Sequence, residues 1–253
     1  MIGLVSLLKE IEGKPKAIFM AGPAGSGKSY ISSKLVPSDF TTINVDDTYE
    51  ELLKSSGIGM KLAQMSPDEL KKSGELMGQA RKATAQKYED ALKDAKNILI
   101  DSVGGSSKVL LKKKQQLEDL GYDTMMIMTY VSPITSLERN KNRDRSLLPS
   151  IILRSWRDVN KNIDVYRQAF GQNFLLLNLD PDGANKEFDE QYIYKTYIEP
   201  LGQIGKEKTP EEKAKSAEEA KQLYSDIKQA MSSQPEFDNF EQSQTKINQF
   251  IQS

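Results

Sequence analysis

The chain has 253 residues with 35 basic and 36 acidic side chains, and it contains neither cysteine nor histidine. The missing cysteines exclude disulfide scaffolds, thiolate zinc sites and cysteine nucleophiles. The missing histidines exclude a Ser-His-Asp triad, so general base work falls to a carboxylate. A net charge of −1 gives no overall attraction to nucleic acid or membranes, and any site for a polyanion must come from local clustering of charge.

The hydropathy pattern predicts no contact with a membrane. No stretch approaches the roughly 20 apolar residues of a membrane span. The first residues, MIGLVSLLKEIEGKPK, favour an amphipathic helix over a signal peptide, because they lack a basic leader and a small-residue cleavage site. With a mean hydropathy of −0.57, we expect a soluble cytoplasmic protein.

Short apolar runs alternate with helical patterns along the first 201 residues. Strands are predicted at 17–21, 40–45, 97–100, 124–130 and 174–179. Helices are predicted at 28–35, 66–95, 108–120, 133–140 and 150–170. This alternation predicts an α/β fold with a parallel five-stranded sheet sandwiched by helices.

Residues 202–253 differ in composition from the rest of the chain. A polar linker at 202–208 is followed by Thr209-Pro210-Glu211-Glu212, which is typical of a capped helix start. We expect one domain over 1–201 and a helical, partly flexible tail over 202–253. Packing of the tail on the core, packing on a partner and partial disorder all remain open.

A phosphate-binding loop follows the first predicted strand. Residues Gly22 to Ser29 read GPAGSGKS and match G-x-x-x-x-G-K-[ST] in full, between a strand and a helix. The backbone N–H groups of such a loop cradle phosphates, the lysine reaches the β- and γ-phosphates, and the hydroxyl ligates Mg²⁺. We therefore expect ATP and Mg²⁺ to bind here, with these residues in contact: Gly22, Ala24, Gly25, Ser26, Gly27, Lys28 and Ser29.

Other classes of nucleoside triphosphatase have weaker support. The two Asn-Lys pairs, at 140–141 and 160–161, lack the aspartate that reads guanine in a GTPase. A motor protein normally has adjacent acids at the end of a strand, but Asp101 is followed by Ser102. These observations favour a small kinase.

A kinase of this kind needs a base beside the acceptor hydroxyl. Asp46 and Asp47 end the second predicted strand, at the sheet edge where ligands of open α/β folds bind. Asp46 could accept the hydroxyl proton while Asp47 caps the next helix. The alternative is that both residues only cap a helix over Thr48–Lys54.

A basic segment lies between Arg139 and Lys161, with seven basic residues against two acidic ones. Arg139 and Arg143 are four residues apart and share a helix face. Kinases use such arginines on a mobile lid to neutralise the transferring phosphoryl group. A solvated helix face is the competing interpretation.

These motifs together resemble the 5′-kinase domain of phage polynucleotide kinases and, more distantly, the zeta-toxin kinases. The resemblance covers roughly residues 15–170 and depends on three stretches: Gly22–Ser29, Ile43–Asp47 and Arg139–Arg143, the last continued by Pro149–Ser155. It implies that Asp46 is the general base and that Arg139 and Arg143 contact the donor phosphates. It also implies that Asp101, with Ser102 beside it, lies near the acceptor or the metal.

Two features bear on the acceptor. Polynucleotide kinases have an arginine just after their Asp pair that helps to hold the acceptor's phosphate, and this chain has Tyr49 there. A tyrosine could bond or stack with a base or a sugar. Asp180-Pro181-Asp182-Gly183 looks like the start of an aspartyl phosphatase, but the short remainder of the chain favours a polar turn.

The sequence therefore predicts an ATP-dependent kinase of a hydroxyl group, with a polynucleotide 5′ end as first choice of acceptor. A zeta-toxin-like kinase of a nucleotide sugar or other small molecule is the second hypothesis. A nucleotide-binding regulatory or assembly protein without phosphotransfer is the third.

Overall fold

Five parallel strands form one sheet in the order β2-β3-β1-β4-β5. The structure is a computed structural model that describes residues 13–60, 65–143, 147–180, 191, 194–200, 209–232 and 235–253. The strands are β1 (Lys16–Ala21), β2 (Thr41–Ile43), β3 (Ile98–Asp101), β4 (Asp123–Tyr130) and β5 (Phe174–Asn178). The predicted α/β fold with a five-stranded parallel sheet is confirmed.

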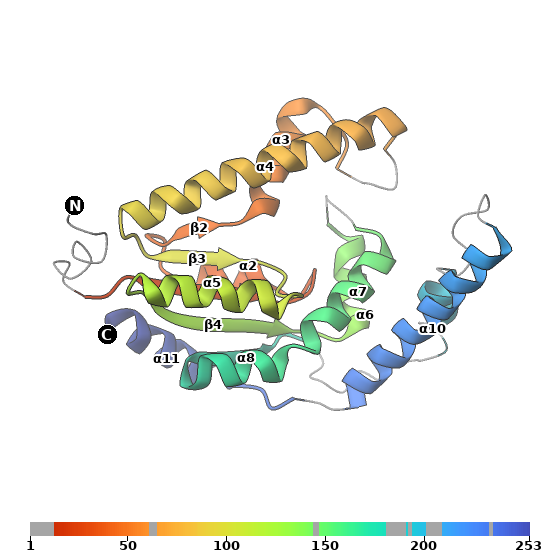
Figure 1. Ribbon diagram of the computed structural model, residues 1–253. Coiled ribbons are helices and arrows are strands. Elements are labelled where there is room, and N and C mark those ends of the chain that lie inside the picture. Colours follow the sequence, from red (N-terminus) through yellow and green to blue (C-terminus); the bar gives the residue numbers. More distant parts are fainter. Residues whose placement is uncertain are drawn as a thin grey trace.

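Helices connect the strands and cover both faces of the sheet (Figure 1). In chain order they are α2 (Lys28–Leu35), α3 (Val45–Ser56), α4 (Pro67–Lys93), α5 (Ser107–Asp119), α6 (Pro133–Lys141), α7 (Pro149–Asn160), α8 (Ile163–Phe170), α10 (Pro210–Ser232) and α11 (Phe240–Gln252). Short turns lie at η2 (Gly171–Asn173) and η4 (Tyr194–Ile198).

The two faces of the sheet have separate cores. Alternate residues of β1 point to opposite faces, as the two-residue period of a strand requires. Phe19 packs with α5, α7 and α8, whereas Ile18 and Met20 pack with α2 and α11. A third apolar cluster, centred on Tyr49 and Leu53, joins α3 to α4, which project together from one edge of the sheet (Figure 1).

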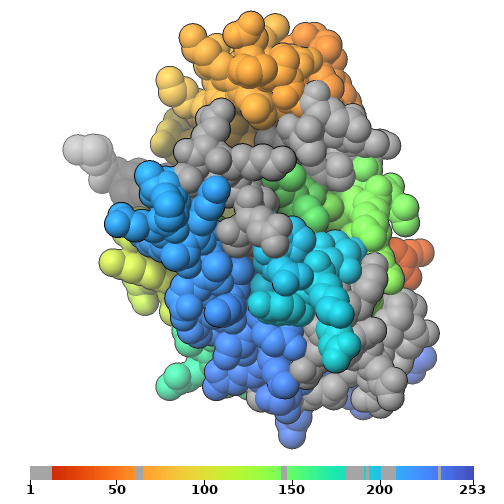
Figure 2. All heavy atoms as spheres, turned by 90° about the vertical axis from the view of Figure 1, so that its right-hand side faces the viewer, coloured from red at the N-terminus to blue at the C-terminus, as the bar shows by residue number. Residues whose placement is uncertain are grey.

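The C-terminal helices pack on the rest of the chain. Phe250 of α11 is buried in the same cluster as Ile18, and Lys16 donates from Nζ to Ser253 Oγ at 3.0 Å. Helix α10 lies along α7, where Arg157 pairs with Asp226 at 3.5 Å. Figure 2 shows α10 in blue beside residues 194–200 in cyan, below the orange α3 and α4.

Two predicted elements differ from the observed ones. The single helix expected over 150–170 is α7 and α8, because Asn162 donates from Nδ2 to the Asp158 carbonyl at 2.7 Å and to the Gly105 carbonyl at 3.0 Å. A side chain that bonds a carbonyl one turn back competes with the helical backbone. The second strand is Thr41–Ile43, shorter than predicted, because α3 already begins at Val45.

Some predictions fall on residues outside the described part of the chain. These are the N-terminal amphipathic helix, the 202–208 linker and the Asp-Gly turn after Asp180. No helix in the part of the chain that the structure describes is long and apolar enough to cross a membrane.

Candidate active site

The phosphate-binding loop connects β1 to α2, as predicted, and its glycines hold backbone conformations that other residues adopt with strain. Gly25 and Gly27 have φ angles of 78° and 90°. At Gly22, with φ 153°, a Cβ would lie 2.3 Å from the Thr129 hydroxyl oxygen. These conformations and close contacts favour glycine at all three positions.

Side chains of helix α6 and strand β4 hold the phosphate-binding loop in place. Ser136 donates from its hydroxyl to the Ala24 carbonyl, and the Ser26 hydroxyl bonds the Thr129 hydroxyl of β4 at 2.7 Å. Arg139 donates from Nη1 to the Gly25 carbonyl at 3.1 Å and from Nη2 to the Leu179 carbonyl at 2.8 Å. The Arg139 guanidinium therefore connects the phosphate-binding loop to the residue that follows β5.

Lys28, the first residue of α2, folds back over the loop. Its Nζ donates to the Gly22 carbonyl at 2.8 Å and to the Pro23 carbonyl at 3.4 Å. Burial lowers the pKa of Lys28, the carboxylate of Asp101 opposes that shift, and the charge of Arg143 adds to it. A desolvated ammonium whose hydrogen bonds to described residues go to carbonyls is poised to bond phosphate oxygens instead.

The two aspartates after β2 lie in the first turn of α3, and neither caps it. Asn44 is the N-cap, and its side chain accepts from the Asp46 backbone N–H at 2.8 Å. The predicted capping role of Asp47, and of the pair for a helix over Thr48–Lys54, is therefore wrong, because α3 starts three residues earlier. Both residues are exposed to solvent. Partial desolvation of the Asp47 carboxyl, together with the charges of Glu50 and Asp46, raises the pKa of Asp47.

Asp101 ends β3 beside these residues. Its Oδ2 accepts from Asn44 Nδ2 at 3.1 Å, while Oδ1 is buried with no hydrogen-bond partner in the described structure. Burial raises the pKa of Asp101 to about 6, against the opposing charge of Lys28. Ser102 follows and donates from its backbone N–H to the Met20 carbonyl at 3.1 Å.

Tyr49 and Arg143 lie in contrasting surroundings. Tyr49 is only 3% exposed, and its hydroxyl bonds that of Ser73, so this side chain joins α3 to α4. Arg143 follows α6 and is exposed, and its charge lowers the pKa of both Lys28 and Asp101.

All of the predicted site residues except Gly22 line one cavity of about 850 Å³. Sequence reasoning missed part of its wall, which comes from α3, α4, α7, the residues just before α7 and the loop between β3 and α5: Glu50, Met77, Val103, Gly105, Leu147, Ile151, Ser155 and Asp158. Ile151, Ser155 and Asp158 recur at helical spacing, a signal that a sequence offers only once α7 is placed beside the cavity. The Ser155 hydroxyl is buried, and the described residues provide no partner for it.

A phosphate-binding loop after the first strand, with strand-end carboxylates across a cavity, defines a P-loop protein of the α/β class. The family model described as Zeta toxin matches residues 6–178, more than half of the chain. The chain belongs to the Zeta toxin family.

Solved structures share the fold at low sequence identity. The AvrRxo1-ORF1:AvrRxo1-ORF2 structure with sulphate ions is 15% identical, with a TM-score of 0.54 over 92% of this chain and 84% of that one. The AvrRxo1-ORF1:-ORF2 structure with ATP is also 15% identical, with a TM-score of 0.53 over 91% and 84%. None of the curated proteins compared with the chain matches it.

The expected likeness to polynucleotide kinases has little support. The Pnkp1/Rnl/Hen1 RNA repair complex matches at 17% identity with a TM-score of 0.45, over 62% of this chain and 48% of that one. So weak a similarity carries no argument about the acceptor.

Proposed function

We propose that this protein is a Mg²⁺-dependent kinase that transfers the γ-phosphate of ATP to a hydroxyl group. The observation that carries the proposal is the single cavity in which Lys28, Asp46, Asp101 and Arg143 meet the phosphate-binding loop. Membership of the Zeta toxin family and the ATP in the AvrRxo1 complex support it.

On the donor side, Lys28 would exchange its carbonyl partners for the β- and γ-phosphates. The backbone N–H groups of the loop and the start of α2 add a positive field for the same phosphates. Arg143, exposed at the end of α6, would meet the charge that develops on the transferring group. Arg139 would act on the donor as well, although its first contacts are with the loop itself.

The residues present fit a magnesium ion bound together with the nucleotide. The Ser29 hydroxyl lines the cavity, and the unpartnered Oδ1 of Asp101 is an oxygen ligand of the kind that Mg²⁺ prefers. No group of three or more acidic side chains within the described residues is arranged to hold a metal by itself. Ser29 and Asp101 would therefore share the ion with phosphates and water, and the bound ion would neutralise phosphate charge.

Asp46 is the proposed general base. It lies at the carboxyl edge of the sheet, exposed toward the cavity, and the Asn44 cap holds its backbone in place. The acceptor hydroxyl would transfer its proton to the Asp46 carboxylate as its oxygen attacks the γ-phosphorus, and ADP would leave.

The acceptor is proposed as a polynucleotide 5′-hydroxyl or, in keeping with the family, a nucleotide sugar or other small molecule. The cations that line the described cavity, Lys28, Arg139 and Arg143, are all assigned here to the donor. Ser155 also lines the cavity, and its unpartnered hydroxyl would suit a hydroxyl-bearing acceptor that places its own phosphates outside the cavity. Tyr49 would offer only its ring to such an acceptor, because its hydroxyl bonds Ser73.

The experiment offers γ-labelled ATP and Mg²⁺ with 5′-hydroxyl oligonucleotides and with nucleotide sugars in parallel. Label on the oligonucleotide supports the first acceptor, and label on the sugar supports the second. If ATP binds but neither acceptor nor any hydroxyl compound in a cell extract is labelled, the protein is a nucleotide-binding regulator and the kinase proposal is wrong.

A further inference from the structure

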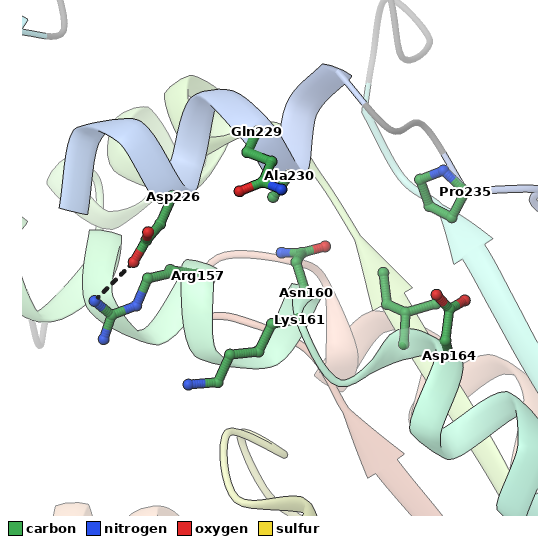
Figure 3. Close-up of a pocket in the computed structure, with 9 residues that line it drawn as sticks. Arg157, Asn160, Lys161, Asp164, Asp226, Gln229, Ala230 and Pro235 are labelled. Carbon is green, nitrogen blue, oxygen red and sulfur yellow. Dashed lines mark hydrogen bonds and ion pairs between the residues drawn. The ribbon is translucent and has the colours of Figure 1, made fainter. Parts of the chain in front are cut away.

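A second pocket, of about 750 Å³, lies outside the candidate active site (Figure 3). It is bordered by the last turn of α7, the start of α8 and the C-terminal half of α10. Its volume is within the range of roughly 300–1,000 Å³ that is common for small-molecule sites.

Asn160 of α7 brings an unpartnered acceptor to this pocket. The side chain is 9% exposed, and its Nδ2 donates to the Trp156 carbonyl at 2.8 Å. That bond identifies the other atom as Oδ1, which is buried without a partner in the described part of the chain. Figure 3 shows the amide pointing from α7 toward α10. A buried acceptor without a partner is unfavourable, and a ligand that donates a hydrogen bond to it would remove that penalty.

The cations of the pocket already have carboxylate partners. Arg157 donates from Nε to Asp158 Oδ1 at 3.0 Å and pairs through Nη1 with Asp226 Oδ2 at 3.5 Å. Lys161 donates from Nζ to the same oxygen of Asp158 at 3.0 Å. An anionic ligand would have to break these pairs, so the pocket is not suited to phosphates or carboxylates.

A carboxylate completes the set of acceptors. Asp164, in the first turn of α8, is exposed and forms no hydrogen bond or ion pair with another described residue. The other carboxylate of the pocket, Asp226, is occupied by Arg157 and by Gln222, whose Nε2 donates to Oδ1 at 2.7 Å. The groups that still lack partners are therefore both acceptors, one neutral and one negatively charged.

We propose that this pocket binds a small aliphatic amine in its protonated form. The ammonium group donates to Asn160 Oδ1 and to the Asp164 carboxylate. The methylene chain lies against Ile163, Ala230 and Pro235, the apolar part of the lining. The site is separate from the phosphate-binding loop and does not depend on the kinase proposal.

Calorimetric titration of the protein with putrescine tests the proposal. The comparison compounds are 1,4-butanediol and succinate, which have the same chain length. Putrescine should bind saturably with one site per chain, whereas the uncharged diol and the dianion should not bind. Asp164→Asn should weaken putrescine binding about tenfold or more, and Asn160→Leu should do the same. Melting curves check that both variants are folded. Should Asn160→Leu fail to fold, Asp164→Asn decides alone, because its side chain is exposed.

Two controls separate this pocket from other acidic regions. Asp68→Asn removes an exposed first-turn carboxylate from α4, far along the chain from the pocket, and should leave the affinity unchanged. Asp47→Asn removes a carboxylate of the catalytic cavity and should also leave it unchanged. No saturable binding of putrescine, equal binding of the diol, or a loss in Asp47→Asn in place of Asp164→Asn would overturn the proposal.

Discussion

Replacing Asp101 with asparagine should stabilise the protein at neutral pH and leave no such gain in acid. Burial raises the pKa of this carboxyl to about 6 from an ordinary 3.8, so the folded state binds the proton more tightly than the unfolded state does. The stability that this proton contributes is present below pH 4 and is lost as pH rises through 6. Asparagine keeps an oxygen that can accept from Asn44 Nδ2 and has no charge to bury.

The size of the stability change follows from the difference between the pKa values of Asp101 in the folded and unfolded states. About two pH units at 1.36 kcal/mol each give an upper limit of ~3 kcal/mol for the wild-type penalty above pH 6. For a chain of this length 1 kcal/mol corresponds to roughly 2–4 °C in Tm, so Asp101→Asn should melt up to about 6–12 °C higher at pH 8.

Thermal melts of wild type and Asp101→Asn from pH 4 to pH 8, without nucleotide, measure this difference. The difference in Tm between Asp101→Asn and wild type should increase between pH 4 and pH 6 and then stay constant. Asp39→Asn, at an exposed carboxylate, is the control and should show no such trend. A constant gap across the range, or a variant that is less stable at pH 8, would refute the argument that burial destabilises the charged form of Asp101.

The remaining predictions concern the catalytic groups. Lys28→Ala should abolish turnover and weaken ATP binding, measured by calorimetry, because the charge on the β- and γ-phosphates is lost. Asp46→Asn should lower kcat by about 10²–10⁴-fold with little change in ATP affinity or Tm; a large loss of stability with normal activity would instead indicate a structural role. Arg143→Ala should lower kcat by up to roughly 10³–10⁵-fold without destabilising the protein. Arg139→Ala should lower kcat and also cost about 2–4 kcal/mol of unfolding free energy, because two charged hydrogen bonds to carbonyls are lost. Lys141→Ala is the control in the same helix, and equal small effects at all three positions would rule out the lid.

The parts of the site that depend on local pattern could be predicted from the sequence. The GPAGSGKS loop needs only a strand before it and a helix after it, and the apolar runs identify both. Asp46 and Asp101 each follow a strand of the predicted parallel sheet, so both are expected at its carboxyl edge. That β2 and β3 are neighbours is seen only in the structure.

Long-range contacts explain what the sequence could not reveal. Arg139 looks like a lid residue, but its bonds go to carbonyls 114 and 40 residues away along the chain. The break between α7 and α8 depends on the bond from Asn162 to Gly105, 57 residues earlier. The α7 wall of the cavity, with Ser155, exists only because the sheet and α6 hold that helix in place.

The central claim, that the cavity transfers phosphate from ATP, is tested most directly by a single-turnover assay. Protein in excess is mixed with γ-labelled ATP, Mg²⁺ and a cell extract that contains small molecules and nucleic acids, and the labelled products are separated. Wild type should transfer the label to a hydroxyl-bearing compound, Asp46→Asn should do so roughly 10²-fold more slowly or worse, and Lys28→Ala should not transfer it. Saturable ATP binding by wild type with the label remaining in ATP would contradict phosphate transfer in this cavity.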